Sequence, residues 1–351
     1  MKEINLQSPV LVTGGTGYLA SWIIKYLLEA GKTVRTTVRN KANTSKYEHL
    51  VKVAEQSSGQ LEIVEADLMQ QHAFIEAMQG CELVIHTASP FKVGKIKNPE
   101  MELVTPALEG TQNVLQAANQ TQTIKRIVLT SSVAAIYGDA EEIKKVEVFD
   151  ESHWNETSNL SHNPYPYSKT VAEKKAWQMA EAQANWDLVV INPGFIMGPS
   201  LTNRKDSTSV DFMLQLAGGK MKSGAPNLYF GVVDIRDVAQ AHINAGYNAE
   251  ASGRHILVAD TLNIYEMGQV IKKRSPLLPV PKGIFPNVLI YLSAPLIGFN
   301  WKFLKKNLGY KLKFDNSYSI NDLNIKYRPI EDTFADHVKQ LKQDKILKPK
   351  Q

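Results

Sequence analysis

A glycine-rich turn near the N-terminus constrains the fold more than any other feature of the sequence. A short apolar run at 8–12 precedes the turn TGGTGYLA at 13–20, and apolar residues at helical spacing follow as far as Ala30. Glycines at the first and fourth positions of GxxGxxA permit a tight turn and a close approach of the backbone to a phosphate, and Ala20 lets the helix pack on the strand. This context predicts a dinucleotide site at the start of the first helix. The residues predicted to line it are Gly14, Thr16, Gly17, Tyr18 and Leu19.

Strand and helix patterns alternate over the first 200 residues. Further β-rich runs occur at 32–38, 61–65, 83–87, 126–131 and 187–192, with helical patterns at 72–78, 106–119 and 165–184. Strands separated by helices of this length form a parallel sheet covered on both faces, and right-handed crossovers make it doubly wound. We therefore expect an α/β fold, a doubly wound parallel (Rossmann) sheet with a smaller, mixed C-terminal substrate lobe.

The regular alternation stops after Pro193. The segment 198–224 is rich in Gly, Ser, Pro and charge, and the segment 232–248 is typical of a strand end feeding a helix that returns to the sheet. We predict a dinucleotide-binding domain over 1–198 plus about 230–260, a smaller substrate lobe over 199–229 and 261–345, and a tail at 346–351.

Composition argues against several classes of function. A single cysteine, Cys81, excludes an internal disulfide framework, and eight scattered histidines without HExxH or CxxC give no metal-ligand spacing. The net charge of +5 is spread along the chain, so we expect no nucleic-acid partner. We also expect no export signal and a cytoplasmic chain, monomeric or homodimeric. The apolar stretch 284–299 is shorter than a membrane span, so we expect it to be buried in the smaller lobe, with no membrane partner.

The end of the second strand predicts which nicotinamide cofactor binds. An NAD site has an Asp or Glu there for the ribose hydroxyls, whereas this strand ends in Val38, Arg39 and Asn40. The Arg39 guanidinium suits a 2′-phosphate, with Lys46 as a second positive charge, although a solvated arginine is the alternative. We expect NADP(H), and we expect Arg35 to be structural.

The next two strand ends carry further candidates. Asp67 and the amide of Leu68 follow the third strand and could meet the adenine, although Asp67 could equally be a cap. In HTASP at 86–90, the small residues Thr87, Ala88 and Ser89 suit a chain that passes close to a cofactor, and His86 is expected to be packed.

Proton-transfer chemistry is indicated by YPYSK. Tyr165 and Lys169 are spaced i, i+4 and share one helix face. The adjacent ammonium would favour the phenolate and bring the tyrosine pKa nearer neutrality. Ser131 or Ser132, after the preceding strand, could donate to a developing oxyanion. Pro193 and Gly194 would complete a nicotinamide pocket.

Together, the motifs TGGTGYLAS, TVRN, DL at 67, HTASPF, TSS, YPYSKTVAEK and NPG resemble the extended short-chain dehydrogenase/reductases (the NAD-dependent epimerase/dehydratase superfamily). Within them the chain looks most like the dihydroflavonol-4-reductase, cinnamoyl-CoA reductase and microbial aldehyde or carbonyl reductase group. The resemblance covers about 8–200. It implies a Ser132, Tyr165 and Lys169 triad, and it implies that Arg39 and Lys46 hold the NADP phosphate. Ala20 departs from the usual third glycine.

The expected function is an NADPH-dependent oxidoreductase of the CH-OH class that reduces an aldehyde or ketone and reversibly oxidises the alcohol. The alternatives are a hydroxysteroid dehydrogenase, a nucleotide-sugar epimerase that could use Arg204 and Lys205, and a non-catalytic NADP-binding redox sensor. We expect the pocket lining to include Phe91, Tyr137, Phe195, Met197 and Phe212, although each could equally be a core residue.

Overall fold

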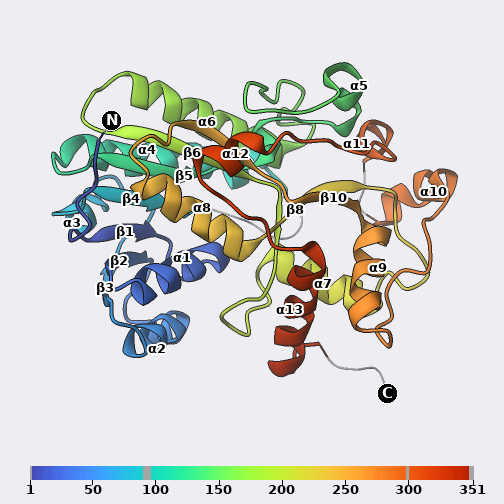
Figure 1. Ribbon diagram of the computed structural model, residues 1–351. Coiled ribbons are helices and arrows are strands. Elements are labelled where there is room, and N and C mark those ends of the chain that lie inside the picture. Colours follow the sequence, from blue (N-terminus) through green and yellow to red (C-terminus); the bar gives the residue numbers. More distant parts are fainter. Residues whose placement is uncertain (1, 90–95, 298–299, 348–351) are drawn as a thin grey trace.

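The computed structural model of the chain describes residues 2–89, 96–297 and 300–347 (Figure 1). Within these residues it contains a seven-stranded and a three-stranded sheet. The larger sheet has the order β3-β2-β1-β4-β5-β6-β9 and is parallel throughout. Its first six strands follow the Rossmann order, so the predicted doubly wound fold is confirmed. The strands are β1 (Val10–Thr13), β2 (Thr33–Val38), β3 (Gln60–Glu65), β4 (Leu83–His86), β5 (Arg126–Thr130), β6 (Asp187–Pro193) and β9 (Gly253–Leu257).

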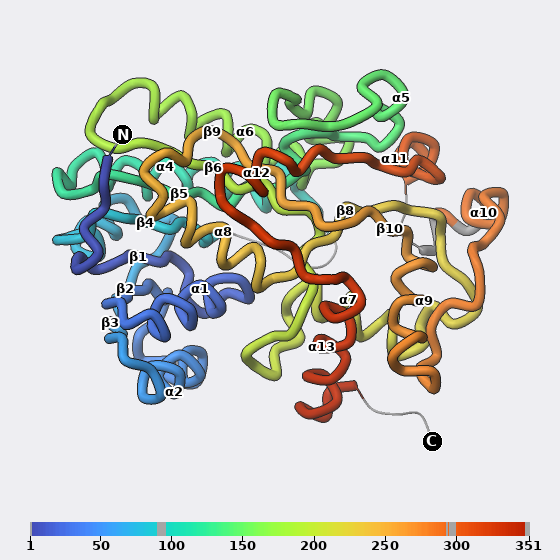
Figure 2. The backbone as a smooth tube through the Cα atoms, in the orientation of Figure 1, coloured from blue at the N-terminus to red at the C-terminus, as the bar shows by residue number. Residues whose placement is uncertain are grey.

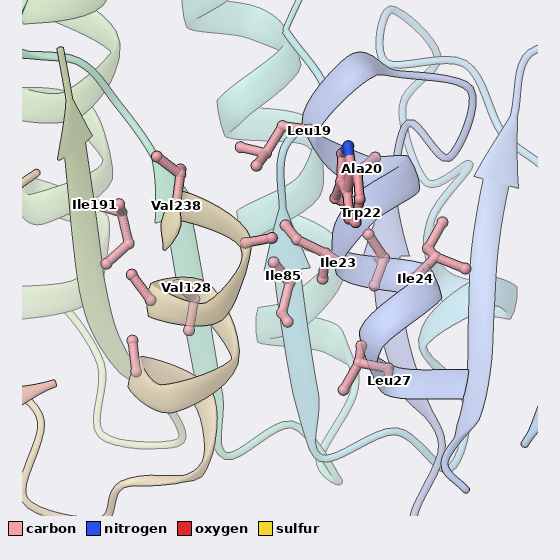
Figure 3. Close-up of a cluster of buried hydrophobic side chains, with 14 of the residues drawn as sticks. Leu19, Ala20, Trp22, Ile23, Ile24, Leu27, Ile85, Val128, Ile191 and Val238 are labelled. Carbon is pink, nitrogen blue, oxygen red and sulfur yellow. The ribbon is translucent and has the colours of Figure 1, made fainter. Parts of the chain in front are cut away.

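Helices cover both faces of the large sheet because its buried strands carry apolar side chains on both sides. Val10 and Val12 pack into one core, and Leu11 between them packs into the other. Figure 3 shows the first core, where Ile23 of α1 and Val238 of α8 lie near strand residues such as Ile85. The first face carries α1 (Tyr18–Glu29), α2 (Glu48–Glu55) and α8 (Ile235–Tyr247); the second carries α3 (Ile75–Met78), α4 (Thr105–Gln120) and α6 (Pro164–Glu181).

The small sheet is continuous with the large one through Gly194. The chain leaves β6 and enters β7 (Phe195–Met197), which pairs parallel with β8 (Tyr229–Asp234); β8 pairs antiparallel with β10 (Asp260–Asn263). A Cβ at Gly194 would lie 2.3 Å from the Gly231 carbonyl oxygen, so the two sheets meet too closely here for any side chain. The helices beside this sheet are α7 (Thr208–Ala217), α9 (Ile264–Arg274), α10 (Asn287–Ile297), α11 (Trp301–Asn307) and α13 (Ile330–Gln343).

The C-terminal segment returns across the large sheet. In Figure 2 the red tube of α12 (Ser317–Asp322) lies beside β9 before the chain descends to α13. Asp322 pairs with His255 of β9 at 2.6 Å, and Asn316 donates to the Val258 carbonyl at 2.7 Å.

The remaining short helix α5 (Ile143–Val146) lies in the long connection between β5 and α6. Leu347 is buried in the small-sheet core.

One expectation about burial was wrong in part. We expected the apolar stretch 284–299 to be buried, but Ile284, Val288, Leu289 and Leu292 are 42%, 68%, 53% and 73% exposed. Among the described side chains of α10, Ile290 and Ala294 pack on the small-sheet core. No helix among the described residues is both long enough and apolar enough to cross a bilayer.

The burial of α1 predicts a clear stability effect. Ile23 is fully buried between α1 and the sheet, so Ile23→Ala should lower the free energy of unfolding by about 3 kcal/mol, because it leaves a cavity in a packed core. Leu6→Ala, at a side chain that is 56% exposed, is the control and should change it by less than about 0.5 kcal/mol. Urea unfolding followed by circular dichroism measures both; equal effects would contradict this packing.

Candidate active site

The turn after β1 forms a cradle bounded by glycines. Gly14 has φ +72°, and a Cβ there would lie 2.9 Å from the Ala88 Cβ, so a side chain is excluded by both conformation and space. Gly17 occupies the N-cap of α1 without a side-chain cap, which leaves the first amides of that helix to a ligand such as a phosphate. Tyr18 and Leu19 then form the first turn of α1.

Strand β2 holds this turn in place. The Thr37 hydroxyl accepts from the Gly14 amide at 3.1 Å, and its carbonyl accepts from the Gly15 amide at 2.9 Å. A Cβ at Gly15 would lie 2.2 Å from the Thr36 hydroxyl oxygen. Gly15 was not among the predicted residues, because the x positions of GxxGxxA carry no requirement of their own; its constraint comes from packing against β2.

The predicted phosphate-binding cations lie on the connection after β2. Arg39 directly follows the strand, Lys46 ends a short 3₁₀ turn at Thr44–Lys46, and both are exposed. Arg35, four residues earlier in β2, is instead held by hydrogen bonds: it donates to Glu62 at 2.6 Å and to the Gln79 carbonyl at 2.7 Å. Arg35 is therefore structural, as expected, while Arg39 is free to face a ligand.

The candidates after β3 have local roles in this structure. The Asp67 carboxylate accepts from the Met69 amide at 2.9 Å. This is the capping geometry that the sequence offered as the alternative to a contact with adenine. The Leu68 carbonyl accepts from the Asn113 side chain at 2.7 Å, and a Cβ on Gly110 of α4 would already be 3.4 Å from Leu68. The strand end is thus fixed against α4.

The segment after β4 links the glycine turn to α6. His86 is buried and shares a 2.8 Å hydrogen bond with the Thr13 hydroxyl, and burial lowers its pKa to about 3, so it is a neutral, packed residue. Thr87 donates to the Thr13 carbonyl at 2.7 Å, and Ser89 accepts from the Lys169 ammonium at 3.3 Å. Ala88 faces Gly14, as described above.

The pair predicted to transfer a proton lies on α6, as its spacing predicts. Tyr165 and Lys169 are both half-buried. Burial of its polar end raises the pKa of Tyr165 to about 12, and burial lowers the pKa of Lys169 to about 8 while the nearby Glu173 carboxylate opposes that shift. We expected the lysine to lower the tyrosine pKa; in this structure, desolvation by burial dominates instead.

The two serines after β5 have different environments. Ser131 is buried and its hydroxyl donates to the Glu173 carboxylate, so it is already engaged. Ser132 is half-buried, caps the 3₁₀ turn Val133–Ala135 by accepting from the Ala134 amide, and donates to the Pro193 carbonyl over a long 3.4 Å. Pro193 ends β6, and the Gly194 amide donates to the Leu257 carbonyl at 3.0 Å. Of the two hydroxyls, that of Ser132 is the more readily turned toward a ligand.

Glu173 was missed by the sequence analysis, although it lies i+4 from Lys169. Its side chain is fully buried and forms an ion pair with Arg254 of β9 at 2.6 Å; the Asn192 side chain donates to it at 2.8 Å. Arg254 also stacks on Trp154, 3.8 Å from the ring centroid. A cavity of about 20 Å³ between Lys169, Glu173 and Ser131 has room for one water molecule.

A second feature that the sequence did not predict is the contact between the segment after β7 and the glycine turn. Tyr18 donates to the Gly198 carbonyl, the Trp22 indole donates to the Pro199 carbonyl at 2.8 Å, and Arg204 donates to the Thr16 carbonyl at 2.7 Å. Arg204 thus places a cation over the glycine turn. No local pattern could reveal this contact, because 188 residues separate its two partners.

The residues predicted to line the pocket are largely packed. Met197 is fully buried in the small-sheet core, and Phe195 packs edge-on against Phe212 with ring centroids 5.1 Å apart. Tyr137 lies against Phe149 with a centroid distance of 5.1 Å. Phe91 lies outside the described residues. Met197 is therefore a core residue and does not line a pocket. The half-buried rings of Tyr137, Phe195 and Phe212 belong to aromatic clusters.

Comparison with solved structures gives close matches over nearly the whole chain. Yeast methylglyoxal/isovaleraldehyde reductase Gre2, complexed with NADPH, superposes with a TM-score of 0.79 at 27% identity, covering 96% of this chain and 99% of that one. Vestitone reductase from alfalfa gives a TM-score of 0.74 at 29% identity, covering 97% and 100%.

Sequence comparison identifies the family. The chain is 36% identical to cinnamoyl-CoA reductase CAD2 of Medicago truncatula over 351 residues, which is 99% of each chain. It is 36% identical to an anthocyanidin reductase of Vitis vinifera over 317 residues, 83% of this chain and 90% of the relative. The model of the NAD dependent epimerase/dehydratase family matches residues 10–259. The predicted resemblance is confirmed, and the chain belongs to the NAD dependent epimerase/dehydratase family.

Proposed function

We propose that the protein is an NADPH-dependent reductase that reduces the carbonyl of an aldehyde or ketone, and reversibly oxidises the alcohol, with Ser132, Tyr165 and Lys169 at the reacting centre. The observation that carries this proposal is the Lys169 contact with Ser89, because it brings the proton-transfer face of α6 to the strand end next to the glycine turn. Relatives that are reductases, including one solved with NADPH, support it.

The residues around the glycine turn fit a dinucleotide phosphate. The uncapped α1 N-terminus and Gly14, whose conformation excludes a side chain, suit a pyrophosphate, and Arg204 adds a cation beside it. Arg39 and Lys46, with no carboxylate at the strand end, suit a 2′-phosphate. The other residues proposed to contact the cofactor are Thr16, Gly17, Tyr18, Leu19, Asp67, Leu68, Thr87, Ala88, Ser89, Tyr165, Lys169, Pro193 and Gly194.

The chain's own chemistry is proton donation and charge stabilisation. NADPH, when bound, supplies the hydride for the carbonyl carbon. Tyr165 donates its phenolic proton to the carbonyl oxygen, and the Ser132 hydroxyl donates a hydrogen bond to the same oxygen as negative charge develops. The Lys169 ammonium stabilises the resulting phenolate, which offsets the effect of burial on the Tyr165 pKa. In the reverse direction the phenolate accepts the alcohol proton.

The direct test is oxidation of NADPH by the purified protein, followed by absorbance, against a panel of aldehydes and ketones with NADH in parallel. Turnover that prefers NADPH and releases NADP⁺ with each product supports the proposal. Tight cofactor binding without net oxidation would overturn it in favour of an epimerase or a sensor.

Removing the phenolic hydroxyl should stop the chemistry without disturbing binding. Tyr165→Phe is expected to lower kcat by at least about a hundredfold, because general acid catalysis contributes that much, while NADPH affinity stays within about threefold. Tyr167→Phe, two residues along the same helix, is the matched control and should keep its activity. Retained turnover in Tyr165→Phe would contradict the assigned acid.

Arg39 should decide the choice of cofactor. Arg39→Ala is expected to raise KM for NADPH about ten- to a hundredfold, the size of a lost charge-assisted contact, and to leave KM for NADH nearly unchanged. Lys41→Ala, at an exposed lysine two residues on, serves as the control. Steady-state kinetics with both cofactors measure the effect; equal changes for NADPH and NADH would argue against a 2′-phosphate contact.

Glu173 is proposed as a positioning residue that keeps Lys169 charged. Lys169 acts as the ammonium, so kcat/KM for reduction should fall as pH rises through about 8, its pKa in this structure. Glu173→Gln removes the charge that raises this pKa, so the alkaline limb of the pH profile should move to lower pH.

Glu173→Gln also leaves the buried Arg254 without its ion-pair partner, so the free energy of unfolding should fall by about 3 kcal/mol or more. The double variant Glu173→Gln with Arg254→Met removes both charges and should recover much of that loss while keeping the shifted pH limb. A pH profile identical to the original in the double variant would show that Glu173 is only structural.

A further inference from the structure

The exposed side of α10 and the start of α11 form a separate surface, which we call the α10–α11 patch. It comprises Ile284, Val288, Leu289, Leu292 and Trp301. Trp301 is 63% exposed, and its indole donates to the Tyr291 carbonyl at 3.0 Å, which fixes the ring between the two helices. An open hollow of about 530 Å³ lies between Tyr291, Leu292, Trp301 and Lys305. Exposed apolar surface concentrated in this way is typical of an interaction site.

The segment of the chain that carries this patch has charges of one sign. Residues 267–314 contain nine Lys and Arg and no Asp or Glu, so this segment is net +9 and the rest of the chain is net −4. Three of the basic residues are engaged, Lys273 with Glu331, Arg274 with Asp332 and Lys306 with Asp139. Lys282, Lys302 and Lys305 flank the apolar side chains and are exposed.

We propose that the α10–α11 patch binds the surface of a membrane that contains anionic phospholipids. Apolar side chains and a tryptophan flanked by lysines are the composition of a segment that lies in the interface, where the apolar groups enter the acyl region and the ammonium groups meet lipid phosphates. The two helices lie at the right-hand edge of the molecule in Figure 1, away from β3, so the patch can meet a surface without blocking the glycine turn. This inference departs from our expectation of no membrane partner.

A second copy of the chain fits this surface less well than a membrane does. In a symmetric dimer the same patch faces itself, so Lys282, Lys302 and Lys305 of the two copies would be brought together, and like charges in an interface are unfavourable. An anionic lipid surface instead neutralises these charges. The charge pattern therefore favours lipid over self-association.

The experiment is flotation of the full-length protein with vesicles of phosphatidylcholine alone and with about one third phosphatidylserine. The protein should bind the anionic vesicles, release as salt is raised and bind the neutral vesicles weakly. Lys302→Gln with Lys305→Gln should lower the partition coefficient by about 25-fold, since each lysine contributes about fivefold. Leu292→Gln with Val288→Gln should lower it by at least about tenfold.

Two matched controls lie on remote surfaces. Leu6→Gln replaces an exposed apolar side chain, 56% accessible, and Lys52→Gln neutralises an exposed lysine of α2; neither should change the partition coefficient. All the substituted side chains are exposed, so thermal unfolding should be the same for every variant.

Two results would overturn the proposal. The first is absence of binding to anionic vesicles, or binding that the patch variants leave unchanged. The second is concentration-dependent dimerisation that Leu292→Gln abolishes without any vesicle binding, which would assign the patch to a second copy. Vesicle binding does not depend on turnover, so the reductase proposal can fail without affecting this result.

Discussion

The buried carboxylate of Glu173 is the interaction on which the arrangement of the site depends. It is bound by Ser131 after β5, Asn192 of β6 and Arg254 of β9, so three strands converge on one turn of α6. A charge buried at this depth is tolerated only when it is fully paired, and the helix is therefore held against both sliding and rotation. Through Trp154, on which Arg254 stacks, the same network fixes the connection before α6.

Most of the large sheet could be predicted because each of its first six strands shows a β-rich run bounded by a helix pattern. Strand β9 could not be predicted, because Arg254 and His255 interrupt its apolar residues. These two polar side chains can be buried only because they pair with Glu173 and Asp322, which lie far away in sequence. The exposure of part of 284–299 was not predicted, for a related reason. Apolar character shows that a side chain avoids water, but it does not show what covers it.

The candidate site was predictable where its geometry is local. The residues at the strand ends, and the shared helix face of Tyr165 and Lys169, could be predicted without tertiary information. The positive φ of Gly14 follows from the turn that it occupies. The contact of Arg204 with the Thr16 carbonyl could not be predicted, because the two residues are 188 positions apart in the sequence. The direction of the Tyr165 pKa shift could not be predicted without the tertiary structure either. Burial competes with the neighbouring charge, and the sequence does not reveal how deeply the hydroxyl lies.

The spacing on α6 has a consequence for how this chain can vary in length. Tyr165, Lys169 and Glu173 occupy successive turns of one helix, and each residue advances the helix by about 100°. A single inserted or deleted residue between 165 and 173 would turn Glu173 out of its buried network while leaving Tyr165 in place, so the phenol and its electrostatic support would separate. Exposed connections, such as the turn at 122–123 between α4 and β5, can absorb insertions with far less disturbance. Divergence of this chain by changes in length is therefore expected in its loops, with the interior of α6 kept at constant length.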